Sequence, residues 1–318
     1  MPHGTWDAPH SWKRISIGNP YRGPPCARGH RRAQGVTRMA RIGWGSRRTI
    51  AAIALVVGIG VGAAVAYSVW GWPKDWYAFR DPASLPANPQ NELIQYGLAL
   101  VVDTPQHIGP LAEEPAMRFA SNELACTNCH LNAGLQRFAS PYVSTFATYP
   151  RMEMDTVETL TERINGCLTR SMNGKPLPGD GREMNALIAY IQYLGVGTPE
   201  GVRVAGMGLL PVPPAPETPD ATRGQAVFAD ACARCHGANG LGEKKTSGAG
   251  YAIPPLWADE SFNAAAGMNT IETAAAFIRA NMPRGIDYRQ PRLTVQQAWD
   301  VAAFVTTRPR PPAPAEAR

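Results

Sequence analysis

Two short motifs constrain this chain more than any other feature, because each combines two cysteines with a histidine at fixed spacing. Residues 126–130 read CTNCH and residues 232–236 read CARCH. C-x-x-C-H is the attachment signature of c-type haem, in which both thiols bind the porphyrin covalently and the adjacent histidine binds the iron. A zinc site would need a second ligand pair close by, and a thioredoxin-like dithiol does not explain the repeated histidine. We therefore predict two covalently bound haem c groups.

The motifs assign six residues: the attaching cysteines are Cys126, Cys129, Cys232 and Cys235, and the proximal iron ligands are His130 and His236. Three of the four other histidines lie in the first 48 residues, so only His107 remains downstream. Two bis-histidine haems are therefore excluded within one chain. At least one iron must take a sulfur atom or another group as its distal ligand.

An apolar segment near the N-terminus indicates export. Residues 49–70 carry no charge, and Arg47 and Arg48 directly precede them. The pattern is typical of a signal peptide or of a single membrane anchor; the length favours an anchor, while Ala64-Val65-Ala66 would suit cleavage. Because haem c is attached after export of the unfolded chain, we expect a periplasmic protein, either free or tethered to the inner membrane by residues 49–70. Residues 1–48 would form a cytoplasmic or disordered extension.

The net charge of +6 comes from this N-terminal extension. Residues 1–48 contain ten basic residues and one acid, which leaves 21 basic and 24 acidic residues in the other 270. The exported part is therefore slightly acidic. This distribution fits a positively charged cytoplasmic flank and argues against nucleic acid as a partner.

The rest of the chain repeats one order of elements. Each half reaches its C-x-x-C-H motif through a helical stretch, continues to a short helix near a Thr-x-Glu-Thr sequence, and ends in an amphipathic helix. The apolar faces of the two last helices are formed by Met184, Leu187, Ile188, Ile191 and Leu194, and by Val295, Ala298, Trp299, Ala302 and Val305. Thr294 and Gln297 have the spacing of a capping box. Strand patterns are almost absent.

The predicted fold is therefore all-α, with two tandem class I cytochrome c-like domains after the N-terminal signal or anchor helix. The domains would cover residues 71–200 and 222–307. Residues 201–221 are rich in proline and predict an extended linker. The tail at residues 308–318 is expected to be disordered.

The repeat also predicts the distal ligands. When the halves are aligned on Thr-x-Glu-Thr, Cys167 and Met282 fall within one residue of each other. A methionine before a proline is typical of cytochrome c, and its thioether suits haem iron; Met268 is the rival to Met282. Cys167 could be an inert buried thiol, a neighbour of the true ligand Met172, or an axial thiolate. The alignment and the shortage of histidines favour the thiolate.

The residues around Cys167 suit sulfur chemistry. In a helix, Arg163 and Ser171 would lie one turn before and one turn after Cys167 on the same face, with Arg170 close by. Guanidinium and hydroxyl groups bind small oxyanions such as a sulfonate. An electron carrier gains little from a cysteine ligand, whereas a catalyst gains a nucleophilic sulfur beside an electron acceptor.

The segment RINGCLTRSMNGKPLP after CTNCH, followed by a second cytochrome domain with NMP, resembles the dihaem thiosulfate dehydrogenases over about residues 90–305. These enzymes couple two thiosulfates to tetrathionate and release two electrons, and some run in reverse as tetrathionate reductases. The resemblance implies a catalytic first haem held by His130 and Cys167. It implies a second haem, held by His236 and Met282, that relays electrons.

The resemblance also implies the remaining site residues and partners. Arg163 and Ser171 match the family's arginine and serine, and Arg151 is the nearest candidate for a second arginine. Some members have a lysine ligand where this chain has Asn281, so we do not expect a Lys/Met exchange. The expected partners are thiosulfate or tetrathionate and an external electron acceptor, such as a soluble cytochrome c or another high-potential redox protein. Two alternatives stay open: a non-catalytic dihaem electron carrier and a Sox-type sulfur-transfer cytochrome.

Overall fold

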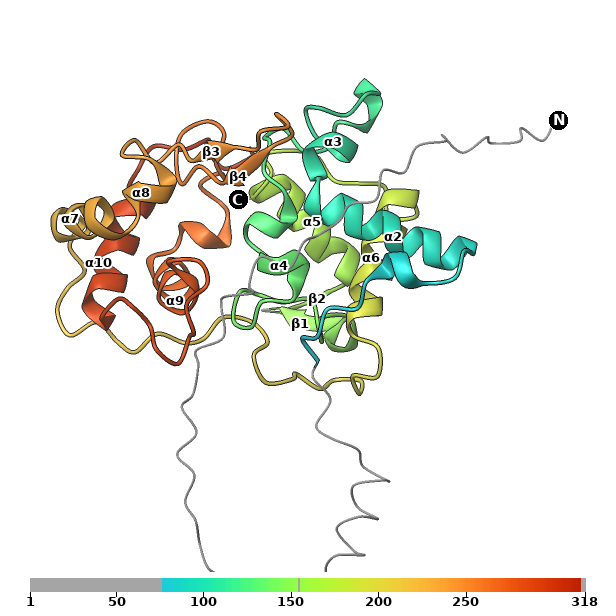
Figure 1. The fold of residues 1–318 in the computed structure, drawn as a ribbon, viewed down its shortest axis with the longest axis horizontal. Coiled ribbons are helices and arrows are strands. Elements are labelled where there is room, and N and C mark those ends of the chain that lie inside the picture. The colour runs from blue at the N-terminus through green and yellow to red at the C-terminus, as the bar shows by residue number, and fades with distance from the viewer. Residues whose placement is uncertain (1–75, 154, 316–318) are drawn as a thin grey trace, which may run out of the picture. The chain divides into compact units, whose positions relative to one another are not determined.

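The computed structural model describes residues 76–153 and 155–315 (Figure 1). The α-helices are α2 (Pro89–Val102), α3 (Thr104–Ile108), α4 (Leu131–Gly134), α5 (Leu160–Arg170), α6 (Arg182–Leu194), α7 (Ala221–Ala231), α8 (Ala233–His236), α9 (Ile271–Asn281) and α10 (Val295–Thr306). The strands form two small antiparallel hairpins, β1 (Arg151–Glu153) with β2 (Thr156–Glu158) and β3 (Glu243–Lys244) with β4 (Tyr251–Ile253). Single 3-10 turns are η1 (Pro82–Ser84), η2 (Pro115–Met117), η3 (Cys126–Asn128), η4 (Phe146–Thr148) and η5 (Gly267–Asn269).

Across the described ranges, no helix combines the length and the apolar character needed to cross a bilayer. The apolar segment at residues 49–70 and the extension at 1–48 lie outside these ranges. Both therefore stay predictions.

In each half, the first long helix packs against the last one. Helix α2 packs against α6, and α7 packs against α10 (Figure 1). A glycine makes each crossing possible: a Cβ on Gly97 would collide with the backbone oxygen of Ala186, and one on Gly224 with that of Asp300. The same close crossing in both halves supports two copies of one small all-α fold.

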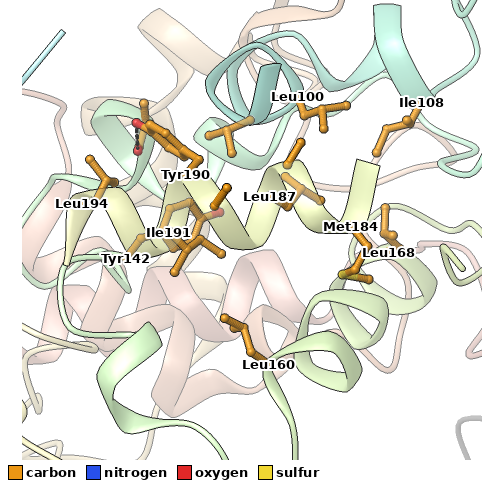
Figure 2. Close-up of a cluster of buried hydrophobic side chains, with 14 of the residues drawn as sticks. Leu100, Ile108, Tyr142, Leu160, Leu168, Met184, Leu187, Tyr190, Ile191 and Leu194 are labelled. Carbon is orange, nitrogen blue, oxygen red and sulfur yellow. Dashed lines mark hydrogen bonds between the residues drawn. The ribbon is translucent and has the colours of Figure 1, made fainter. Parts of the chain in front are cut away.

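The last helix of the first half supplies much of its core. Four of the five residues predicted for the apolar face of α6, namely Met184, Leu187, Ile191 and Leu194, are buried (Figure 2). Tyr190 joins them, and its hydroxyl donates a hydrogen bond to the backbone oxygen of Ala133 at 2.9 Å. In the second half, α10 opens with the predicted capping box of Thr294 and Gln297. The helical periodicity therefore predicted both helices and most of the buried face of α6. In α10 it predicted Ala298, Ala302 and Val305 correctly but missed the buried Val301 and Phe304.

The proline-rich segment between the halves is extended but bound. The backbone oxygens of Gly206 and Gly208 accept hydrogen bonds from Phe138 and Ser140 at 2.7 and 2.9 Å, and Val204 is buried in the first core. We call residues 203–209 the strap. Further along, the indole of Trp299 donates to the backbone oxygen of Pro213. The proline content of this segment does not reveal that its backbone carbonyl groups accept hydrogen bonds from donors on both halves.

The described part of the C-terminal tail also differs from the disorder that we expected. The backbone oxygens of Pro309 and Pro311 accept hydrogen bonds from Ala258 and Ala264 at 2.8 and 2.9 Å. The guanidinium of Arg310 lies over the ring of Phe262, 4.3 Å from its centroid. Proline lacks a backbone donor but keeps its acceptor, so a proline-rich tail can dock where a loop offers free amides.

Candidate functional site

One cavity in the first half, about 190 Å³ in volume, collects every residue that we predicted for the first haem and for catalysis: Cys126, Cys129, His130, Arg151, Arg163, Cys167 and Ser171 line it. The 3-10 turn η3 and the two residues after it supply the haem motif, while α5 supplies Arg163 and Cys167 and is capped by Ser171. Met172 also lines the cavity, whereas His107 does not.

The side chains of His130 and Cys167 oppose each other in this cavity. Nδ1 of His130 lies 2.6 Å from the backbone oxygen of Ser140, to which it can donate. That bond leaves Nε2 as the atom that can bind a metal. The imidazole is also within hydrogen-bonding reach of the Cys167 thiol. His130 and Cys167 therefore offer the nitrogen and the sulfur that would hold a haem iron here.

The thiols of the cavity differ in acidity. Burial raises the pKa of Cys126 to about 11 and that of Cys129 to about 12. Burial acts on Cys167 in the same direction, but the hydrogen bond with His130 and the charges of Arg163 and Arg170 outweigh it and lower its pKa to about 7. Cys167 is therefore the thiol of this cavity that its surroundings favour as a thiolate.

The two arginines that line the same wall differ in their partners. Nη2 of Arg151 lies 2.9 Å from carboxylate oxygens of both Glu153 and Glu158, so its charge is largely compensated. The guanidinium of Arg163 has no ion pair with any described residue, and the charge of Cys167 is the main cause of its raised pKa. Arg163 is thus the better placed of the two to bind an added anion.

A second cavity, about 290 Å³ in volume, repeats this arrangement in the second half. Cys232, Cys235, His236, Met268 and Met282 all line it. Nδ1 of His236 lies 3.0 Å from the backbone oxygen of Pro254, again leaving Nε2 for a metal. The neighbouring Asn281 does not line the cavity; its amide donates to the backbone oxygens of Phe138 and Phe277.

The register of the repeat needs one correction. Helix α9 begins right after Thr270, but Thr156 opens strand β2, and α5 begins only at Leu160. Cys167 therefore lies inside its helix, whereas Met282 is the residue that caps α9. Both sulfur atoms belong to haem cavities, but they reach them from different positions on the two helices.

The two cavities share a wall. Cys129 lines both, and its neighbours Leu124, Thr127, Asn128 and Leu131 line the second cavity. Leu131 also packs in one apolar cluster with Phe277, Met268 and Met282 of the second half. The attachment motif of the first haem thus forms part of the pocket of the second.

The residues present fit haem c in both halves. Each cavity offers two thiols for attachment and a histidine whose Nδ1 already contacts a backbone carbonyl oxygen. Each also offers a sulfur atom, from Cys167 or from a methionine, as a second ligand for the iron. Most of the remaining lining is apolar, as a porphyrin requires.

Comparison with known proteins identifies the family. Residues 117–199 match the SoxA/TsdA cytochrome c domain, and residues 221–309 match the cytochrome c family. The thiosulfate dehydrogenase of Stutzerimonas stutzeri is 40% identical over 72% of this chain and 71% of its own length. The chain belongs to the thiosulfate dehydrogenase family. The thiosulfate dehydrogenase of Allochromatium vinosum is 37% identical over 72% of this chain and 82% of its own length.

A solved thiosulfate dehydrogenase agrees in structure as well. TsdBA from Marichromatium purpuratum, in its as-isolated form, matches with a TM-score of 0.67 at 36% identity. The match covers 74% of this chain and 50% of the TsdBA chain, so this chain spans about half of that protein. Both cytochrome c domains of the thiosulfate dehydrogenase family are present here, and with them two covalent haem c groups.

Sequence reasoning missed one part of the first cavity. Arg203, Met207 and Gly208 of the strap line it, although they lie in the segment predicted to be a linker. No periodicity or motif marks these residues. Hydrogen bonds that join the strap to Phe138, Ser140 and Ser144 bring them to the cavity of Cys167.

Proposed function

We propose that this chain is a thiosulfate dehydrogenase that couples two thiosulfates to tetrathionate beside Cys167 and delivers two electrons to an external acceptor. Membership of the family supports this activity. The observation that carries it for this chain is the position of Cys167, which faces His130 in the same cavity as Arg163 and Ser171.

Arg163 and Ser171 would hold the first thiosulfate. Their side chains flank Cys167 along α5, and neither has an ion pair or side-chain hydrogen bond with a described residue. Both are therefore available to bind sulfonate oxygens, for which guanidinium and hydroxyl donors are well suited. Docked in this way, the anion would direct its outer sulfur, the sulfane sulfur, toward Sγ of Cys167.

The bonds can be followed at Cys167. A bond forms between Sγ of the thiolate and the sulfane sulfur of the first thiosulfate, and two electrons leave. When bound, the haems supply the redox chemistry by accepting these electrons, one each. The sulfane sulfur of a second thiosulfate then attacks the sulfur attached to Cys167. The bond to Sγ breaks, tetrathionate leaves, and the thiolate is restored without any net transfer of a proton.

The compartment and the electron acceptor belong to the proposal too. Covalent haem c supports a periplasmic location, and the segment at residues 49–70 would act as an export signal or an inner-membrane anchor. A soluble cytochrome c or another high-potential redox protein would collect the electrons from the second domain. Whether the enzyme also runs as a tetrathionate reductase depends on the haem potentials.

The test uses the purified protein with both haems attached. We expect the wild type to convert thiosulfate to tetrathionate with ferricyanide as acceptor, and we expect Cys167→Gly to lose at least about 100-fold in rate, because it removes the nucleophile. Haem content and reduction by dithionite serve as the control for loading. Full turnover by Cys167→Gly would refute the role of the thiol. No turnover by either protein would leave a non-catalytic electron carrier as the better description.

A further inference from the structure

The strap brings a further cation to the cavity of Cys167. Arg203, Met207 and Gly208 line this cavity together with Arg163 and Ser171. We propose that Arg203 binds the second thiosulfate, the one that attacks the sulfur bound to Cys167. This inference rests on the proposed function, because it assigns a subsite within that reaction.

Hydrogen bonds fix the strap beside the catalytic residues. The backbone nitrogen of Val204, next to Arg203, donates to the hydroxyl of Ser144 at 3.3 Å. Gly208 accepts from the backbone of Ser140, whose own carbonyl oxygen accepts from His130. Arg203 is therefore connected to the His130 side of the cavity through ordered backbone rather than through free linker.

The side chain of Arg203 folds back along the strap. Gly208 has a φ of +74°, and a Cβ there would lie 3.1 Å from Nη2 of Arg203. Both residues line the cavity that Cys167 also lines, and the guanidinium lies close to Gly208. Glycine at position 208 supplies both the left-handed backbone and the space for the guanidinium.

The charge of Arg203 is free to bind an anion. Arg151 pairs with Glu153 and Glu158, and Nε of Arg170 donates to the backbone oxygen of Gly166. Arg203 has no ion pair and no hydrogen bond with any described residue. Two thiosulfate dianions must meet in this cavity, and their mutual repulsion has to be offset by more than one cation. Arg163 and Arg203 are the lining arginines that remain for this purpose.

The positions of Arg163 and Arg203 indicate that they bind different thiosulfates. Arg163 lies one helical turn before Cys167 on α5, whereas Arg203 belongs to the strap. Arg203 is also exposed, whereas Arg163 is partly buried. Arg163 therefore belongs beside the thiol, where the first thiosulfate bonds. Arg203 lies at the mouth of the cavity, where the second one arrives.

The experiment compares Arg203→Gln with Arg289→Gln in the haem-loaded protein. Arg289 is a matched control, because its side chain is 71% exposed and it lines neither cavity. We expect Arg203→Gln to raise the thiosulfate KM about tenfold, a change of ~1.4 kcal/mol, and Arg289→Gln to leave it unchanged. We also expect the thiosulfate adduct on Cys167 to accumulate during turnover of Arg203→Gln in intact-protein mass spectra, because its removal by the second thiosulfate is slowed. Arg203→Lys should recover part of the loss.

The result that would overturn the inference is an unchanged KM together with no accumulated adduct in Arg203→Gln. A shifted reduction potential of the first haem with an unchanged KM would also overturn it, since Arg203 would then act as a haem propionate partner. If the proposed function itself is wrong, the wild type forms no tetrathionate in the same assay, so the two outcomes can be told apart.

Discussion

Arg163 and Arg151 line the same cavity, but the residues around them leave only Arg163 without a carboxylate partner. A hydrogen bond to a charged group contributes about 1.5–3 kcal/mol. We expect Arg163→Gln to lower kcat/KM for thiosulfate by roughly 10- to 100-fold, and Arg151→Gln to lower it less. Steady-state oxidation with ferricyanide measures both. An equal or larger loss in Arg151→Gln would show that the pairing with Glu153 and Glu158 positions Arg151 for the substrate instead of neutralising it.

At the scale of single residues, the spacing of residues in the sequence predicted which side chains gather around Cys167. The i−4 and i+4 positions of one helix brought Arg163 and Ser171 to the right cavity, and C-x-x-C-H placed His130 opposite the thiol. Arg203 could not be predicted in this way. It reaches the site through hydrogen bonds of the strap that are mostly between backbone groups, and backbone groups are common to every residue and carry no sequence signal.

The crossing of α2 and α6 is a close backbone approach in the first domain, so it allows a stability test. In Gly97→Ala the added methyl would meet the backbone oxygen of Ala186, which cannot rotate away. Overpacking of this kind costs about 1–3 kcal/mol, more than the gain of at most about 1 kcal/mol from replacing glycine in a helix. We expect the melting temperature to fall by about 2–8 °C.

Gly267→Ala is the matched control for that variant, because a Cβ at this position meets no atom within 4 Å. Thermal unfolding of the haem-loaded proteins, followed by circular dichroism, compares the two. Equal melting temperatures would show that α2 and α6 can separate without loss of stability.

Among the elements, the long amphipathic helices were predictable and the short pieces were not. α6 and α10 have a strong 3.6-residue pattern and, in α10, a capping box. Strands β1 and β2 have three residues each, too few for a periodic signal. The pairing of Val157 with Met152 depends on the tertiary structure and leaves no pattern in the local sequence. That pairing takes Thr156 out of the helix that we expected there.

At the scale of the whole molecule, we expect Met282, the proposed distal ligand, to set the potential of the second haem and so its place in electron transfer. Because methionine ligation raises the potential of a haem, we expect Met282→Ala to lower the midpoint potential of the second haem and to slow multiple turnover. Met268→Ala is the matched control, since Met268 lines the same cavity. Spectroelectrochemical titration distinguishes them. A lowered potential in Met268→Ala alone would reassign the distal ligand.

The motifs and the repeat revealed two haem domains, but they could not predict how the domains contact each other. Lys245 of the second half pairs with Asp103 of the first at 2.7 Å, and Asn128 donates to the backbone oxygen of Tyr251. The two residues of each pair are more than a hundred positions apart, and they lie in a loop, at a helix end or in the short strand β4. Such contacts have no periodic pattern in the sequence, because they depend on the finished surfaces of both domains.

The wall shared by the two cavities limits how far the halves can be treated as modules. Residues 124 and 127–129 and Leu131 line the second haem pocket although they precede that domain by some ninety positions. A second domain grafted alone onto another scaffold would therefore carry an open-sided pocket. To shield the second haem from water, a chimera must carry the CTNCH loop together with the second domain. An exchange of first domains between relatives also alters the solvent exposure of the second haem.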